Sequence, residues 1–189
     1  MATPYQYWTW LNVISPDESK NLVNFINLNY DKVEPNGLGA TTEEGVSKKN
    51  LNCKQISWCK IKDKLNFILD RAYSINNNHF GFSLYPKNDH DIFNLNTYNE
   101  NVKASYDWHV DESRDLMQDI KLTVLINLST QSYEGGKFSM FHTNEFSVPD
   151  YDKPGSMIMF KSHMNHKVSP VTSGERISLA GFLKGPKFI

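Results

Sequence analysis

The chain has few cysteines, almost no net charge and no long apolar run. Its two cysteines, Cys53 and Cys59, exclude a framework of disulfides and form no CxxC metal or redox motif, so we expect two reduced thiols. No apolar run approaches the roughly 20 residues needed to cross a bilayer. Met1–Trp10 lacks the basic and apolar regions of a signal peptide. These absences predict a soluble, cytoplasmic protein without a membrane partner.

The charge and the composition restrict the class of protein further. A formal net charge of -1 and the lack of a basic stripe give no sign of a polyanion-binding surface, so nucleic acid is not an expected partner. Hydrophobic residues make up 39% and aromatic residues 13%, which excludes a disordered chain. A chain of 189 residues can bury a core of its own, and we expect a single domain over residues 1–189.

Residues 1–79 are predicted to form a helical support and a loop. Ser15-Pro16-Asp17-Glu18 has the pattern of a capping box with proline at the first helical position, and the apolar periodicity that follows predicts a helix to about Asn29. A second helix is expected from about Lys60 to Asn76. Between them, Glu34–Asn52 is polar and contains three glycines. It is interpreted as a long loop or weak hairpin, either a lid over a substrate or a plain surface excursion.

Residues 80–186 are predicted to form a β core. Short runs of β-branched and aromatic residues alternate there with glycine and proline turn signals. This spacing is typical of a barrel or a two-sheet jelly roll, with the two N-terminal helices against one outer sheet face. The expected fold class is therefore mainly β with N-terminal helices (α+β). The predicted strands are Phe80–Tyr85, Ile92–Tyr98, Lys121–Leu128, Lys137–Phe141, Ser156–Phe160 and Arg176–Lys184.

A candidate metal site begins at Trp108-His109-Val110-Asp111. Residues i and i+2 of an extended chain point to the same side, so His109 and Asp111 can direct an imidazole and a carboxylate to one point. Such a pair is a weak signal alone, since strand histidines and turn aspartates have ordinary structural roles. His166, beyond the predicted strand that ends at Phe160, can supply a third ligand. Two histidines and one carboxylate hold Fe(II) with coordination positions left open.

Arg176 adds a second feature to this pattern. It lies ten residues after His166, past a turn at Ser173-Gly174, which lets two adjacent strands bring an iron ligand and a guanidinium into one pocket. A planar guanidinium can hold a carboxylate through two parallel hydrogen bonds. Two other kinds of protein remain open at this point, a non-catalytic jelly-roll module that binds a metal or a sugar and a zinc hydrolase. Both leave Arg176 and its spacing unexplained.

Together these motifs resemble the prolyl 4-hydroxylase-type 2-oxoglutarate/Fe(II)-dependent oxygenase superfamily. The end of the chain is similar to a small bacterial and phage branch, which implies a bacterial cell or a phage-infected host. The resemblance implies a double-stranded β-helix, the cupin-like jelly roll, over about Phe80–Pro186. The motifs that carry it are His109-x-Asp111, Tyr133-Glu134-Gly135-Gly136-Lys137-Phe138, Pro154-Gly155-Ser156, and His166 through Arg176 to Pro186.

The same resemblance implies an activity. Members of the family couple the decarboxylation of 2-oxoglutarate, which gives succinate and CO2, to hydroxylation of a second substrate by O2, with ascorbate as an optional reductant. A peptidyl prolyl residue is the expected substrate, and a free amino acid or another small molecule is the alternative. His109, Asp111 and His166 fall on the Fe(II) ligands, and Arg176 falls on the residue that anchors the distal carboxylate of 2-oxoglutarate.

Further cosubstrate-binding candidates follow from the resemblance and from strand parity. Tyr98 resembles a tyrosine whose hydroxyl helps to bind the same carboxylate, and Ser178 completes an Arg-x-Ser arrangement seen in some relatives. Thr123 and Asn127 share the inward parity of their strand, so either can touch the cosubstrate. Asn127 stands where many prolyl hydroxylases carry a tyrosine, and this departure concerns the details of cosubstrate binding.

Other residues near these motifs receive lesser roles. His163 competes with His166 as a third ligand, but the family pattern starts at His166, so we expect His163 in an entrance loop. His142 is expected in an exposed loop. Tyr106 and Trp108 flank the metal motif and are candidates to line a substrate channel, although strand aromatics more often serve packing. Glu112 and Arg114 are candidates for the rim.

Overall fold

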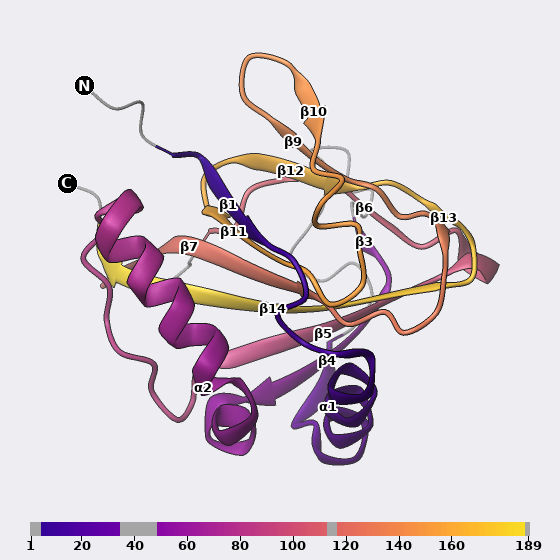
Figure 1. Cartoon of the computed structure of the whole chain (residues 1–189), viewed down its shortest axis with the longest axis horizontal. Helices are drawn as coiled ribbons and strands as arrows, with labels where there is room; N and C mark the ends of the chain where they lie inside the picture. The colour runs from indigo at the N-terminus through magenta and orange to yellow at the C-terminus, as the bar shows by residue number, and fades with distance from the viewer. Residues whose placement is uncertain (1–4, 35–48, 113–116, 188–189) are drawn as a thin grey trace.

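Two antiparallel β-sheets face each other in the computed structural model, which describes residues 5–34, 49–112 and 117–187 (Figure 1). The larger sheet contains, in spatial order, β1 (Tyr7–Trp10), β11 (Met157–Lys161), β7 (Gln118–Asn127), β14 (Glu175–Pro186), β5 (Ile92–Asn99), β4 (Asn52–Ser57) and β2 (Lys32–Glu34). The smaller sheet contains β10 (Glu145–Ser147), β9 (Phe138–Phe141), β12 (Asn165–Val168), β6 (Ser105–His109) and β3 (Lys49–Asn50). A short ribbon pairs β13 (Val171–Ser173) with β8 (Glu134–Gly135), and a 3-10 turn, η2 (Glu100–Val102), follows β5. The predicted jelly-roll fold is confirmed.

The two predicted helices are also confirmed, with small shifts of their ends. α1 (Pro16–Asn29) begins at the predicted capping box, in which the Ser15 hydroxyl accepts from the backbone N–H of Glu18 and the Glu18 carboxylate accepts from the backbone N–H of Ser15. α2 (Trp58–Ile75) continues into a π-helical turn, η1 (Asn76–Phe80). No helix in the described parts of the chain is long and apolar enough to cross a membrane.

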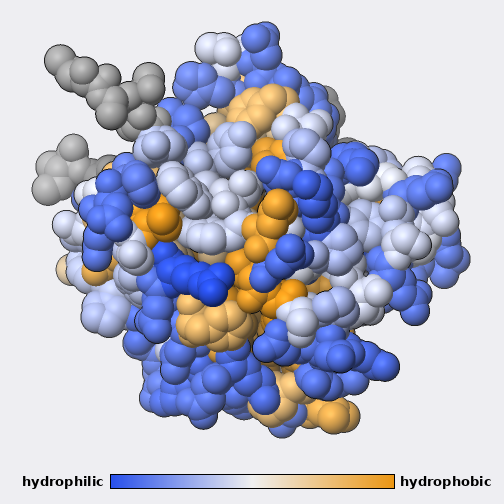
Figure 2. Space-filling view, in the orientation of Figure 1, coloured by the Kyte–Doolittle hydropathy of each residue, from blue (hydrophilic) through white to orange (hydrophobic). Residues whose placement is uncertain are grey.

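The larger sheet has a hydrophobic core on each of its faces. On its outer face, side chains of α1 and α2 such as Ile26, Ile61 and Leu65 pack against β5, β7, β11 and β14, as the helices beneath that sheet in Figure 1 indicate. On its inner face, a second cluster that includes Phe138 and Phe160 fills part of the space between the sheets. Hydrophilic side chains dominate the surface shown in Figure 2, and apolar ones appear mainly near the middle of that view. Helix packing was predicted from the pattern of apolar residues, and the structure confirms it.

The predicted strand Phe80–Tyr85 is wrong. Phe80 ends the π-helical turn and the residues after it have no regular structure. The alternation of apolar and polar residues is real, because Phe82 and Leu84 pack against the helix-side core. The N–H of Tyr85 donates to the carbonyl of Lys184 in the larger sheet, but the segment is not a strand of that sheet. The alternating pattern thus reflects packing against the helix-side core and not pairing in a sheet.

Residues before Phe80 contribute strands that the sequence pattern did not indicate. β1 pairs with β11 at one edge of the larger sheet, while β4 and β2 extend the other edge beyond β5. β3 pairs with β6 in the smaller sheet. The predicted loop Glu34–Asn52 therefore starts and ends in strands, and its interpretation as a lid concerns residues 35–48, which lie outside the described residues.

Cys53 and Cys59 are free thiols, and burial raises the pKa of Cys53 to about 12.

Gly135 is required where β8 meets β13. Its φ is +71°, and a Cβ at this position would lie 2.2 Å from the carbonyl oxygen of Pro170. We expect Gly135→Ala to lower the free energy of unfolding by about 3 kcal/mol, through left-handed strain and steric overlap, as measured by urea denaturation. Gly81→Ala is the matched control, because Gly81 has φ +74° but no atom within 4 Å of the point where a Cβ would lie. Equal losses for the two variants would contradict the steric part of this prediction.

Candidate metal and cosubstrate site

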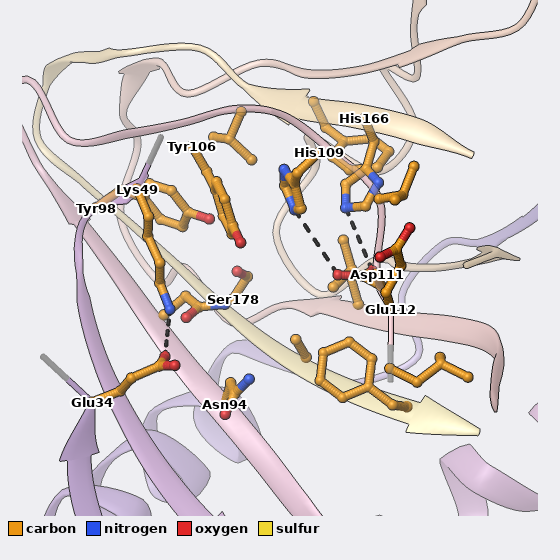
Figure 3. Close-up of a pocket in the computed structure, with 18 of the residues that line it drawn as sticks. Glu34, Lys49, Asn94, Tyr98, Tyr106, His109, Asp111, Glu112, His166 and Ser178 are labelled. Atoms are coloured by element: carbon orange, nitrogen blue, oxygen red, sulfur yellow. Dashed lines mark hydrogen bonds and ion pairs between the residues drawn. The ribbon is translucent and has the colours of Figure 1, made fainter. Parts of the chain in front are cut away.

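A cavity of about 490 Å³ lies between the two sheets (Figure 3). The larger sheet contributes inward-facing side chains of β5, β7 and β14, and the smaller sheet contributes those of β3, β6, β9 and β12. Side chains alternate between the two faces of a sheet, and every second residue of β5, β12 and β14 in this region faces the cavity. The candidate metal ligands and Arg176 all line this one space.

The structure brings His109, Asp111 and His166 together at one wall of the cavity. His109 ends β6 and His166 lies on β12, where the two are direct cross-strand partners. The Nε2 atoms lie 4.0 Å (His109) and 3.5 Å (His166) from carboxylate oxygens of Asp111, and one ligand atom from each residue lies within 4.8 Å of the others. Among the described residues this is a donor set of two imidazoles and one carboxylate, which suits Fe(II) with open positions.

Backbone carbonyls orient both imidazoles. Nδ1 of His109 lies 2.7 Å from the carbonyl oxygen of Asp107, and Nδ1 of His166 lies 2.9 Å from that of Met164. A carbonyl only accepts, so these contacts place the proton on Nδ1 and leave Nε2 as the metal-binding atom. The Tyr106 ring stacks on the face of the His109 ring, with the ring centroids 3.5 Å apart. The two donors are therefore oriented before any metal binds.

Asp111 is held by a side chain of the opposite sheet. The Thr123 hydroxyl of β7 donates to Oδ2 of Asp111 at 2.6 Å, and the backbone N–H of Asp111 donates to the carbonyl of Ser162 at 3.0 Å. Thr123 is fully buried. Its predicted contact with the cosubstrate stays a prediction, and the structure shows that its hydroxyl binds the carboxylate of the candidate metal ligand.

This contact leads to a prediction for Thr123→Val. Removing the hydroxyl while keeping the shape should weaken divalent metal binding 10- to 100-fold, roughly the usual effect of losing a hydrogen bond that orients a ligand. The dissociation constant for Co(II), followed by its visible absorption, measures the effect. Thr97→Val is the control, because Thr97 alternates with the cavity-lining Tyr98 and so faces the other side of β5. Unchanged Co(II) affinity in Thr123→Val would show that Thr123 does not position Asp111.

Arg176 lies across the cavity as a fully buried guanidinium. Nη1 donates to the Ser178 hydroxyl at 3.3 Å, whereas Nε and Nη2 have no hydrogen-bond partner among the described residues. The rings of Tyr98 and Tyr151 flank it, with centroids 5.1 and 5.4 Å from the guanidinium carbon. Burial raises the pKa of both phenols, so they remain neutral beside the cation. A buried charge without an anionic partner is costly, which makes this position suited to an incoming carboxylate.

The relation between His166 and Arg176 differs from the expectation in one respect. The strands that carry them are not neighbours in one sheet, because β12 belongs to the smaller sheet and β14 to the larger. The chain crosses between the sheets through β13. The ten-residue spacing therefore places the imidazole and the guanidinium on opposite walls of the cavity, with room for a ligand between them.

The remaining predicted residues divide into two groups. Tyr98 and Ser178 line the cavity beside Arg176, and Tyr106 and Glu112 line it as well. Asn127 has another task, since its amide donates to the carbonyl oxygens of Tyr151 and Asp152 and thereby anchors that loop. Four of these remaining residues do not line the cavity: Asn127, Trp108, which contacts Phe141 on the outer face of β6, and the exposed His142 and His163. Arg114 lies outside the described residues.

Sequence reasoning missed four polar residues of the cavity wall. Asn94 and Asn96 lie four and two residues before Tyr98 on β5, so they face the same side of the strand. The alternation along this strand could therefore have predicted that both line the cavity. Glu34 and Lys49 also line the cavity and form an ion pair, Nζ to Oε2, of 2.5 Å. No local pattern indicated this pair, because its members come from the edges of different sheets.

Comparisons with known proteins agree with this geometry. A family model described as the 2OG-Fe(II) oxygenase superfamily matches residues 93–184. A PKHD-type hydroxylase of Synechococcus sp. (strain CC9605) is 32% identical over 109 residues, which make up 54% of this chain and 45% of that protein. The chain thus spans less than half the length of this curated relative.

Solved structures share the fold. A Pseudomonas putida prolyl-4-hydroxylase has a TM-score of 0.68 and 18% identity, over 98% of this chain and 95% of the other. A non-heme alpha-ketoglutarate-dependent carbocyclase from nogalamycin biosynthesis has a TM-score of 0.66 and 14% identity, over 95% and 80%. Residues 93–184, which carry the cavity strands from β5 to β14, thus belong to the 2OG-Fe(II) oxygenase superfamily by the family model, and the solved structures show that the whole described chain shares their fold.

Proposed function

We propose that this chain is an Fe(II)- and 2-oxoglutarate-dependent dioxygenase that hydroxylates a C–H bond of a peptidyl prolyl residue. The observation that supports it most is the pairing of two features in one cavity, the His109–Asp111–His166 group and the buried Arg176. A metal site alone explains the first feature. Only a ligand that reaches from a metal to a carboxylate-binding guanidinium explains both, and 2-oxoglutarate has this form.

The residues divide the work in the following way. His109, Asp111 and His166 would hold Fe(II), which supplies the activation of O2 and the oxidative decarboxylation of 2-oxoglutarate to succinate and CO2. Arg176 would bind the distal carboxylate through its unpaired N–H groups, with Ser178 and Tyr98 beside it. Buried side chains such as Phe138 and Leu125 restrict water in the same space. Together these residues orient the cosubstrate and keep one side of the metal available.

The names of similar proteins support the substrate class. The Synechococcus relative is a PKHD-type hydroxylase, and the P. putida structure, which matches 98% of this chain and 95% of its own, is a prolyl-4-hydroxylase. The carbocyclase with a comparable TM-score shows that the fold also carries other reactions. The choice of a prolyl residue therefore rests on the hydroxylase names, and the oxygenase chemistry rests on the cavity.

The proposal is tested by succinate formation. Protein reconstituted anaerobically with Fe(II) and supplied with 2-oxoglutarate, ascorbate and O2 should release succinate, and a panel of proline-containing peptides should raise the rate and gain one oxygen atom by mass spectrometry. Asp111→Ala and Arg176→Lys serve as controls that should both lose the activity. Failure to bind 2-oxoglutarate by calorimetry, together with no succinate above background, would reject the dioxygenase. Succinate without any modified prolyl peptide would reject the substrate alone.

A further inference from the structure

We propose that the ion pair Lys49–Glu34 binds the main-chain amides of the substrate. The pair thereby selects an uncharged residue within a polypeptide over charged small molecules. This inference rests on the proposed function, because it concerns the same cavity. It assigns the recognition of the substrate to residues outside the metal group and the 2-oxoglutarate anchor.

The ion pair stands in the wall of the cavity, on the side away from the metal group. Lys49 lies on β3 and Glu34 at the end of β2, so the pair joins an edge of each sheet, and Figure 3 shows the two side chains meeting beside Asn94 and Ser178. The side chains are only 6% and 16% exposed. Lys49 Nζ lies 5.8 Å from the ring centroid of Tyr106, which in turn stacks on His109. The pair is thus separated from a candidate metal ligand by one aromatic ring.

An ion pair at this place needs an explanation. Removing two charged groups from water costs several kcal/mol each, roughly, and two apolar side chains would join the sheet edges at lower cost. A structural clasp between the sheets is one use of the pair. A second use is recognition, since both charged groups face the space that a substrate must enter. The two uses predict different results when the two charges are exchanged.

The charges of the cavity favour a substrate without net charge. Beside the ion pair, the charged lining residues are Arg176, Asp111 and the exposed Glu112 at the rim. The charges of bound Fe(II) and Arg176 would balance those of the 2-oxoglutarate dianion and Asp111, the ion pair is neutral by itself, and the remaining charge of Glu112 is exposed to water, which screens it. A substrate with a net charge would therefore bring an uncompensated charge into a space of low dielectric constant.

The arrangement of polar and apolar lining groups favours an amide. A peptide group presents a carbonyl oxygen and an N–H, which match an ammonium donor and a carboxylate acceptor respectively. Asn94 adds an amide on the same side, held by the Gln55 side chain at 3.2 Å. The lining also includes Ile120, Ala180 and Phe182, which provide apolar contact for an aliphatic ring. A cyclic apolar side chain with amides on both sides has this combination of groups.

Four proline derivatives that differ mainly in charge test the proposal. They are N-acetyl-L-proline N-methylamide (neutral), N-acetyl-L-proline (anion), L-prolinamide (cation) and free L-proline (zwitterion). Binding to the protein loaded with Fe(II) and 2-oxoglutarate is measured without O2, by ligand-observed NMR. The neutral diamide should bind at least about tenfold more tightly than the other three, a difference of about 1.4 kcal/mol. Equal or tighter binding of free L-proline would overturn the choice of a polypeptide residue.

Variants of the pair should change this order in opposite directions. Glu34→Gln leaves the positive charge of Lys49, so N-acetyl-L-proline should gain about tenfold relative to the diamide. Lys49→Gln leaves the negative charge of Glu34, so L-prolinamide should gain by a similar factor. Lys153→Gln is the control, because it breaks an exposed ion pair with Asp150 and should not change the order. The same shift for all four compounds in both single variants would overturn the recognition role.

Exchange of the two charges separates recognition from a structural clasp. The double variant Glu34→Lys with Lys49→Glu keeps an ion pair but reverses its direction, so the melting temperature should be retained while the diamide binds about tenfold more weakly. Wild-type binding of the diamide by this variant would identify the pair as a clasp and overturn the proposal. Succinate release by the wild-type protein is scored separately, so a failure of the dioxygenase reaction is distinguishable from a failure of substrate recognition.

Discussion

Replacing Arg176 with methionine should weaken 2-oxoglutarate binding by about 100-fold or more. Two charge-assisted hydrogen bonds between a guanidinium and a carboxylate contribute about 1.5 to 3 kcal/mol each, and methionine supplies neither. Arg176 is fully buried, so no water can replace the lost donors. Isothermal titration of 2-oxoglutarate into the metal-loaded protein measures the effect.

The same variant should not lower the stability of the protein without ligands. Arg176 is a buried cation with two unpaired N–H groups, and replacement of a lone buried charge by an apolar side chain of similar length removes a desolvation cost. We expect an unchanged or higher melting temperature without 2-oxoglutarate. In the wild type, the cosubstrate at 100 times its dissociation constant should add about 2.7 kcal/mol of stability, and in Arg176→Met it should add almost none.

Arg71→Met provides the matched control, since Arg71 is an exposed residue of α2. It should keep both the affinity for 2-oxoglutarate and the ligand-dependent rise in melting temperature. A titration in which Arg176→Met still binds 2-oxoglutarate within a factor of three of the wild type would show that another group binds the distal carboxylate. A large fall in melting temperature without ligand would show instead that Arg176 supports the fold.

Asp111→Ala should weaken the binding of a divalent metal by at least about 100-fold. The variant removes the only carboxylate of the three-residue group and leaves two neutral imidazoles, with less charge to attract a cation. It also leaves the Thr123 hydroxyl without its acceptor. Mn(II) binding, followed by the loss of the free-ion signal in electron paramagnetic resonance, measures the affinity, and 2-oxoglutarate-dependent succinate release should fall below detection.

Asp107→Asn is a control on β6, just before the metal group. Asp107 is exposed, and its backbone carbonyl, which orients His109, is unchanged by this substitution. Mn(II) affinity should therefore stay within a factor of about two of the wild type. If Asp111→Ala and Asp107→Asn bind Mn(II) equally well, the metal does not bind at the predicted group.

Local patterns in the sequence were sufficient for much of the fold. The capping box at Ser15 and the apolar periodicity determine where α1 begins and which face it buries, because both are interactions within a few residues. Five of the six predicted strands match observed strands within three residues at each end for the same reason, namely β5, β7, β9, β11 and β14, whereas β6, β8, β10, β12 and β13 were not among the predicted strands. The exception, Phe80–Tyr85, shows the limit of a local pattern, since a strand also needs a partner along its whole length.

For the cavity, the sequence by itself determined the kinds of group and their order along the chain. An i, i+2 spacing directs His109 and Asp111 to one side of the chain wherever that chain is extended, and a ten-residue separation ties Arg176 to His166. The choice of 2-oxoglutarate followed from the resemblance of this ordered pattern to the motifs of the 2-oxoglutarate/Fe(II) oxygenases. The assumption that His166 and Arg176 lie on adjacent strands was wrong, but the resemblance did not depend on it.

Only the tertiary structure decided which groups face one another. It placed His166 and Arg176 on opposite sheets, directed Thr123 to Asp111, turned Asn127 away to a loop, and joined Glu34 to Lys49. The physical reason is that sheet pairing and the distance between two packed sheets are set by contacts between residues far apart in the chain. Local propensity carries no information about such contacts. The candidate metal-binding and carboxylate-binding side chains can therefore be identified from the sequence, but the residues that contact them cannot.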